Sequence, residues 1–64
     1  MKTIYLNMRT IYGVETVDQF TKGEDAPKEE KEFIKYVNEM VKNYREGGMH
    51  VYKSQRCTKD WKNK

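Results

Sequence analysis

The chain has 64 residues, enough for one small domain and too few for two. Hydrophobic and charged residues each make up 36% of it, so a thin core must offset the entropy of ordering the whole chain. No apolar run reaches the roughly 20 residues of a membrane span. Polar residues also interrupt the N-terminal segment, where a signal peptide has a continuous apolar block. We therefore expect a cytoplasmic protein that contacts no membrane.

The net charge of +3 is concentrated near the C-terminus. Residues 47–64 carry five basic side chains against Asp60 alone, which gives this segment a charge of +4. The five are Lys53, Arg56, Lys59, Lys62 and Lys64. The imbalance has two interpretations: the positive charges keep the chain in solution, or they attract an acidic partner.

The first third of the chain is typical of a β-hairpin. Residues 3–10 alternate apolar and polar side chains, which predicts a half-buried strand. Gly13 indicates a tight turn, and residues 14–21 resume a β-type composition. Two valines of the second segment are three residues apart and cannot share a face of a regular strand. A bulge near Glu15-Thr16 restores the alternation.

A loop and a helix follow the hairpin. Gly23 suits the loop, Asp25 is placed to cap the helix, and Pro27 fits its first turn. Apolar residues at spacings of three and four then predict a helix of about 20 residues. This stripe consists of Phe33, Ile34, Val37, Met40, Val41 and Tyr44. The pair Gly47-Gly48 supplies the left-handed glycine that commonly ends a helix.

Residues 49–57 alternate again and predict a third strand. Residues 58–64 have no period, so we expect a basic, frayed tail with Trp61 placed to fold back onto the domain. Residues 1–57 then form a single small α+β domain with the order β-β-α-β. A right-handed crossover through the helix delivers the third strand parallel to the second. The simplest sheet then has the first strand in the centre, in a three-stranded, mainly antiparallel sheet of order 2-1-3 with the helix packed on one face.

The predicted core joins the apolar sides of the strands to the helix stripe. Its members are Ile4, Leu6, Met8, Val17, Phe20, Phe33, Val37, Met40, Val41, Tyr44, Met49 and Val51. The other face of the sheet is expected to have nothing in the chain to cover it. That face would carry Thr3, Tyr5, Asn7 and Arg9 from the first strand and His50, Tyr52, Ser54 and Arg56 from the third.

This uncovered face and the basic C-terminus hold the candidate binding residues, which are Tyr5, Asn7, Arg9, His50, Tyr52, Arg56, Lys59, Trp61 and Lys62. Tyrosine and arginine are enriched at protein interfaces, so the first hypothesis is a protein partner or a homodimer. The alternative is a nucleic-acid-binding accessory factor, because tyrosines stack on bases and arginines pair with phosphates. An ordinary solvated face stays open beside both, because tyrosine is common on strands.

No arrangement of residues indicates catalysis. His50 is the single histidine, and it has no positioned partner or pocket in the predicted fold. Cys57 is the single cysteine, which excludes an intrachain disulfide. One His and one Cys do not make a zinc site at usable spacing. We predict a non-enzymatic interaction protein with no metal, no cofactor and no small-molecule substrate.

Two segments, Met8-Arg9-Thr10-Ile11-Tyr12-Gly13-Val14-Glu15-Thr16-Val17-Asp18 and Arg56-Cys57-Thr58-Lys59-Asp60-Trp61-Lys62, carry a resemblance. Together they resemble short, uncharacterised proteins encoded on bacterial conjugative or other mobile elements. The resemblance spans nearly the whole chain and transfers no catalytic or binding residue. It implies a small cytoplasmic accessory protein in a system that handles DNA.

Overall fold

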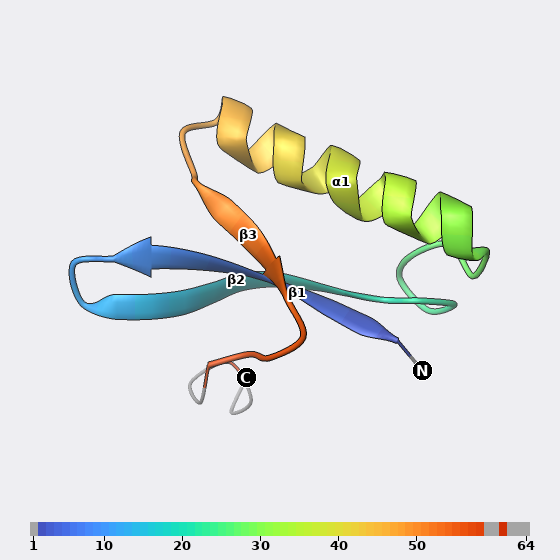
Figure 1. Ribbon diagram of the computed structural model, residues 1–64, viewed down its shortest axis with the longest axis horizontal. Helices are drawn as coiled ribbons and strands as arrows, with labels where there is room; N and C mark the ends of the chain where they lie inside the picture. Colours follow the sequence, from blue (N-terminus) through green and yellow to red (C-terminus); the bar gives the residue numbers. More distant parts are fainter. Residues whose placement is uncertain (1, 59–60, 62–64) are drawn as a thin grey trace.

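Four elements follow one another along the chain in the order strand, strand, helix, strand (Figure 1). They are β1 (Thr3–Thr10), β2 (Gly13–Thr21), α1 (Glu30–Glu46) and β3 (Val51–Ser54). The computed structural model describes residues 2–58 and 61. The strands form one antiparallel sheet of order β2-β1-β3, and α1 lies on one face of it. The predicted α+β fold class and strand order are confirmed.

The turn between β1 and β2 has Ile11 and Tyr12 at its tip. Thr10 pairs with Gly13 across the hairpin, and the Thr10 hydroxyl donates to the Gly13 carbonyl at 3.0 Å. The same hydroxyl oxygen accepts a hydrogen bond from the Tyr12 amide at 3.1 Å. Gly13 has a φ of +118°, a conformation that L side chains rarely adopt. The sequence placed this turn correctly.

The bulge in the hairpin lies one residue later than the sequence predicted. Leu6 pairs with Asp18 and Asn7 pairs with Thr16, so Val17 has no residue opposite it. Val17 is half-buried and packs against the core. The expected position at Glu15-Thr16 is wrong because Thr16 is fixed opposite Asn7 by a hydrogen bond between their side chains.

The core lies between the sheet and α1. Its buried residues are Leu6, Phe20, Phe33, Val37, Val41 and Val51, and the half-buried residues around them are Ile4, Met8, Val17, Ala26, Tyr36, Met40, Tyr44 and Met49. All twelve predicted core residues belong to this cluster. The sequence missed Ala26 and Tyr36. The Tyr36 ring meets the Phe20 ring edge to face, with centroids 5.4 Å apart, so it extends the core toward β2.

The helix begins later than predicted. Its N-cap is Glu29, whose side chain makes no capping hydrogen bond, and its 17 residues replace the expected 20 or so. Asp25 does not cap the helix because its carboxylate accepts the Thr21 amide at 2.6 Å and closes the loop after β2. Pro27 therefore lies in the connection, before the helix starts.

The helix ends as the glycine pair predicted, with the left-handed residue at Gly48 (φ +92°). The Gly48 amide donates to the Arg45 carbonyl at 3.0 Å and the Met49 amide to the Tyr44 carbonyl at 2.9 Å. These two bonds are those of a Schellman motif, which satisfies carbonyls that the last turn leaves open.

The third strand is shorter than predicted, and the chain after it covers the face that was expected to be open. β3 ends at Ser54, whose hydroxyl oxygen accepts the Arg56 amide at 3.1 Å and bends the chain. The segment beyond crosses the sheet on the side opposite α1 (Figure 1). Thr58 and Trp61 bond to side chains of β2 there. Trp61 therefore folds back onto the domain as expected, and Thr58 does not belong to a frayed tail. Residues 59–60 and 62–64 of the predicted tail lie outside the described residues.

Candidate functional site

Asn7 stands at the centre of the face opposite the helix, and it is part of the fold. It is 5% exposed, and Thr16 beside it is 4% exposed. The Thr16 hydroxyl donates to the Asn7 side-chain carbonyl at 2.6 Å, and the Asn7 amide donates to the Arg56 backbone carbonyl at 2.9 Å. The Thr58 amide in turn donates to the Thr16 hydroxyl oxygen at 2.9 Å. Asn7 is therefore withdrawn from the predicted binding residues, because its polar groups hold the C-terminal segment.

Two aromatic candidates, Trp61 and Tyr5, are half-buried on this face of the sheet. Trp61 is half-buried, and its indole N–H donates to the Gln19 side-chain carbonyl at 2.7 Å. Tyr5 is half-buried between Gln19 and Ser54 on the neighbouring strands. Lys59 and Lys62 lie outside the described residues. Of the two tyrosines expected on an uncovered face, only Tyr52 on β3 is exposed. The exposed part of this face is therefore the part beside β3.

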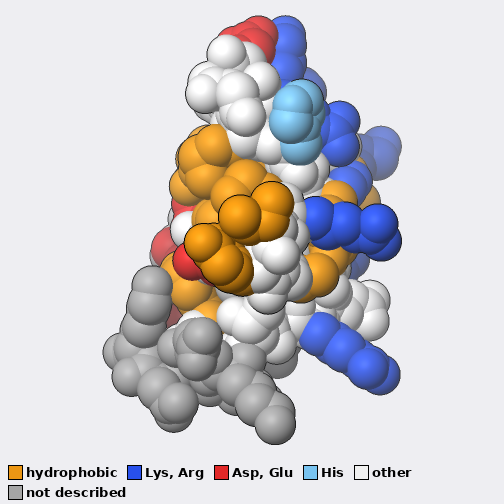
Figure 2. Space-filling view, turned by 90° about the vertical axis from the view of Figure 1, so that its left-hand side faces the viewer, with side chains coloured by type: hydrophobic (Ala, Val, Ile, Leu, Met, Phe, Trp, Pro, Cys, Tyr) orange, Lys and Arg blue, Asp and Glu red, His pale blue; other side chains and the backbone are white. Residues whose placement is uncertain are grey.

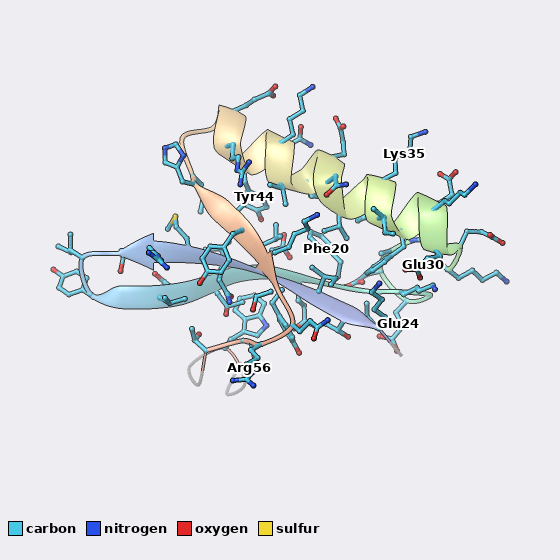
Figure 3. The ribbon with its side chains drawn as sticks, in the orientation of Figure 1. Phe20, Glu24, Glu30, Lys35, Tyr44 and Arg56 are labelled. Carbon is cyan, nitrogen blue, oxygen red and sulfur yellow. The ribbon has the colours of Figure 1, made fainter. Side chains whose placement is uncertain are left out.

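Four predicted residues stay exposed on that side: Arg9, His50, Tyr52 and Arg56. Tyr52 lies opposite Asn7 in the sheet, and Arg9 shares its face because it is two residues further along β1. His50 precedes β3 and Arg56 follows it. In Figure 3, Arg56 lies on the C-terminal segment, on the opposite side of the sheet from α1.

The helix adds basic residues that the sequence did not assign to the site. Lys42 and Arg45 line a hollow of about 620 Å³ together with Tyr52 and Lys53 of β3. The Arg45 guanidinium donates to the Val51 carbonyl at 3.3 and 3.2 Å, which fixes the end of α1 against β3. The Lys53 ammonium donates to the Asn38 side-chain carbonyl at 2.6 Å across the same junction.

Three cations, Lys42, Arg45 and Lys53, thus line one hollow with the exposed Tyr52. Two further exposed cations are Arg9, on the sheet face of Tyr52, and Arg56, two residues after the end of β3. We call this the β3 surface, and it consists of Arg9, Lys42, Arg45, Tyr52, Lys53 and Arg56. The spacing of Asn38, Lys42 and Arg45 puts them on one flank of the helix, which is the signal that sequence reasoning could have used. The direction of that flank depends on how the helix lies over the sheet, which the spacing alone does not give.

The positive charge of the β3 surface is not cancelled by ion pairs among the described residues. Lys2 and Lys22, at the other end of the molecule, both pair with Glu30, at 2.8 and 2.5 Å. Their hydrogen bonds, that of Lys2 first, lower the pKa of Glu30 from its usual 4.5 to about 2. Within the described part of the chain, no carboxylate pairs with a cation of the β3 surface. Figure 2 shows the Lys and Arg side chains gathered on one side of the hairpin tip, beside the histidine.

The hairpin tip itself is apolar and exposed. Ile11 is 90% exposed, Tyr12 92% and Val14 46%. Tyr12 and Val14 also line a hollow of about 400 Å³ between the hairpin and the C-terminal segment. Its other lining residues are Thr10, Glu15, Thr16, Thr58 and Trp61. Figure 2 shows hydrophobic side chains at the centre of the face that it views.

Groups that could carry other chemistry lie apart. His50 is exposed, and Cys57 is a half-buried free thiol. Across residues 2–58 and 61, no three His, Cys, Asp or Glu side chains are placed to hold a metal ion. The one helix of the described chain is neither long nor apolar enough to cross a membrane. The expected cytoplasmic location stays a prediction.

Comparison with known proteins adds no relative to this picture. No protein-family model, no curated protein and no solved structure matches the chain. The resemblance to proteins of mobile elements therefore stays a prediction.

Proposed function

We propose that the protein is a non-enzymatic accessory factor that binds single-stranded nucleic acid on the β3 surface. The observation that carries this proposal is the hollow that Tyr52 shares with Lys42, Arg45 and Lys53, with the exposed Arg9 on the same sheet face as Tyr52 and the exposed Arg56 just after β3. Proteins that bind single strands combine a positively charged track for the phosphates with aromatic rings on which bases stack. The β3 surface has both, on β3, the last turns of α1, β1 and the segment after β3.

Each part of the surface has a role in this proposal. The exposed Arg9 shares the sheet face of Tyr52 and the exposed Arg56 follows β3, while Lys42 and Arg45 line the hollow beside Tyr52 on the helix side. Cations on both sides of the ring place phosphates along the backbone of a strand whose base stacks on Tyr52. A duplex keeps its bases stacked inside, so it gains the phosphate contacts but not the stacking.

The covered face changes the balance between the two sequence hypotheses. The hypothesis of a protein interface or face-to-face homodimer relied on an open sheet carrying Tyr5 and Asn7. The C-terminal segment occupies part of that face. The side chain of Asn7 is hydrogen-bonded to the Arg56 carbonyl of this segment and to Thr16. Arg9 and Arg56, the basic residues of the alternative hypothesis that the structure describes, are exposed, which favours nucleic acid. A protein partner or a homodimer on the sheet face stays a prediction.

The experiment measures fluorescence anisotropy of a labelled single strand of about 12 nucleotides. We expect affinity to fall steeply between about 50 and 200 mM salt, because binding releases counterions from the phosphates. Changing Arg9→Gln and Lys42→Gln together should weaken binding and lower the salt slope by about 1.4, since each phosphate contact to a single strand contributes about 0.7. Tyr52→Ala should weaken binding while leaving the salt slope unchanged.

The matched control is the double variant Lys28→Gln and Lys35→Gln, which removes the same charge from exposed residues outside the β3 surface. Figure 3 shows Lys35 on the helix, directed away from the sheet. The control should retain the salt slope of the unmodified protein. Equal loss in both double variants would reduce the effect to net charge and overturn the proposed site. Tighter binding to a duplex of the same length would overturn the preference for single strands.

A further inference from the structure

The two most exposed apolar side chains of the described protein sit at a position where the fold does not need them. Turns favour Gly, Asn, Asp, Pro and Ser, yet the hairpin turn presents Ile11 and Tyr12, 90% and 92% exposed. The turn is held by Thr10 and Gly13 through the hydrogen bonds described above. Burial of Ile11 and Tyr12 therefore contributes almost nothing to folding, and a binding role explains their size and hydrophobicity.

The hairpin carries these side chains beyond the rest of the sheet. β3 pairs with β1 only from Tyr5 to Met8, so the arm from Arg9 to Val14 projects past it (Figure 1). From Asn7, which lies opposite Tyr52, to Ile11 is four residues, or about 14 Å at the rise of an antiparallel strand. At a stacked spacing of about 3.4 Å per nucleotide, that distance spans about four nucleotides.

Along β1, Arg9 lies between Asn7, which is opposite Tyr52, and the turn that carries Tyr12. It is exposed, forms no ion pair among the described residues and shares the sheet face of Tyr52. A cation midway along the arm matches the phosphates of a strand that passes from one ring to the other. The hollow beside Tyr12, about 400 Å³ in volume, leaves room for a planar base next to the ring.

We propose that single-stranded nucleic acid bound at Tyr52 continues along the hairpin arm, past Arg9, and that Tyr12 stacks on a second base at the tip beside Ile11. This inference rests on the proposed function of the β3 surface. It adds a second stacking platform and sets a minimum length for full affinity. Strands too short to join the two rings lose the contact with Tyr12.

The test compares single strands of about 2 and about 10 nucleotides: the shorter cannot span the roughly 14 Å between the two rings at about 3.4 Å per nucleotide, and the longer is within the range that small binding domains cover. Tyr12→Ala should weaken binding of the longer strand about tenfold, as expected for one lost stacking contact, and leave the shorter strand unaffected. Tyr52→Ala should weaken binding of both. Tyr12→Phe keeps the aromatic face and should restore the affinity for the longer strand. Circular dichroism should show the same melting curve for all Tyr12 variants, because the side chain is exposed.

The outcomes separate this inference from the proposed function. If Tyr12→Ala leaves the longer strand fully bound while Tyr52→Ala weakens both strands, the β3 surface stands and the tip contact is wrong. If the unmodified protein binds neither strand, both proposals are wrong. Vesicles containing phosphatidylserine provide the third arm. If Tyr12→Ala abolishes binding to these vesicles and not to the longer strand, the tip contacts lipid and the inference is overturned.

Discussion

The hydroxyl of Thr16 donates to the side-chain carbonyl of Asn7 at 2.6 Å, in the middle of the sheet and on the side away from the helix. The two residues lie opposite each other at the bulge, and both are almost completely buried. Their remaining polar groups bind the backbone of Arg56 and Thr58. This pair therefore joins the sheet to a C-terminal segment 40 to 50 residues away in sequence, as the separations of 42 and 49 show.

Removal of the Asn7 side chain should destabilise the fold. Asn7→Ala leaves the Thr16 hydroxyl and the Arg56 carbonyl without their partner, and an unsatisfied buried polar group costs about 1–3 kcal/mol. Urea unfolding should show a lower midpoint with an unchanged slope. The control is Asn38→Ala, at an exposed residue bonded to Lys53, which should change stability by less than about 0.5 kcal/mol. Equal effects of the two variants would contradict a structural role for the buried network.

Shortening the chain tests whether the C-terminal segment is part of the domain. A chain that ends at Cys57 loses the bonds from Thr58 to Thr16 and from Trp61 to Gln19. At about 1 kcal/mol for each hydrogen bond, the loss of about 2 kcal/mol should lower the melting temperature by about 10 °C in a domain of this size. A melting temperature equal to that of the full chain would restore the sequence expectation of a frayed tail.

The fold was predictable where local patterns decide it. The period of two in β1 and the stripe of α1 reflect which side chains face the core, and a chain this small has few ways to bury both. A crossover from β2 through α1 makes β3 parallel to β2, and the simplest sheet then has β1 between them, as observed. The helix start was not predictable in this way. Asp25 is a good N-cap by residue type, but the backbone of the preceding loop places the Thr21 amide within its reach.

The candidate site was half predictable for a related reason. Arg9, Tyr52 and Arg56 follow from strand alternation and proximity to β3. Lys42 and Tyr52 line the same hollow because of how the helix lies over the sheet, which no local pattern specifies. The loss of Asn7 from the site depends on a contact with Arg56 across 49 residues. Contacts between residues this far apart in sequence depend on the completed fold, so they cannot be predicted from the pattern of neighbouring residues.

The hydrogen bond of Tyr44 should make the free energy of unfolding depend on pH above about pH 10. Its hydroxyl donates to Asp18 at 2.7 Å, below the helix in Figure 3, and this hydrogen bond, with burial, raises the pKa of Tyr44 from 10 to about 12. Because the folded pKa is the higher one, the bond contributes fully below about pH 10 and is lost as the pH rises toward 12. Tyr44→Phe should lower stability near neutral pH by about 1 kcal/mol.

The difference between the unmodified protein and Tyr44→Phe should shrink as the pH passes from about 10 to 12. Urea unfolding measured across this range provides the check, and ultraviolet titration should show one tyrosinate that forms late and is missing from the variant. Tyr36→Phe keeps the ring contact with Phe20 and serves as the control. A constant difference between the unmodified protein and Tyr44→Phe at all pH values would show that the bond to Asp18 is not the cause.

The two glycines at the end of α1 should respond oppositely to alanine. Gly48 has a φ of +92°, and a Cβ there would be strained even though nothing lies within 4 Å. Gly48→Ala should therefore destabilise the protein by about 1 kcal/mol. Gly47 has a φ of −82°, and an added Cβ would meet the Tyr44 carbonyl at an ordinary 3.5 Å. Gly47→Ala should be neutral or slightly stabilising. Thermal melting that ranks the two variants in the reverse order would contradict the Schellman geometry.

Glu46 opposes the proposed ligand from within its own site. It lines the hollow that contains Lys42, Arg45 and Tyr52, so its carboxylate repels any phosphate bound there. Glu46→Gln should tighten binding of single strands about twofold at low salt, as expected for like charges about 8 Å apart in water, and the gain should vanish at high salt. The control is Glu24→Gln, which changes net charge equally at the far end of the molecule (Figure 3). If anisotropy titrations show the same increase in affinity for both variants, only net charge matters, and the proposal that the β3 surface binds the ligand is wrong.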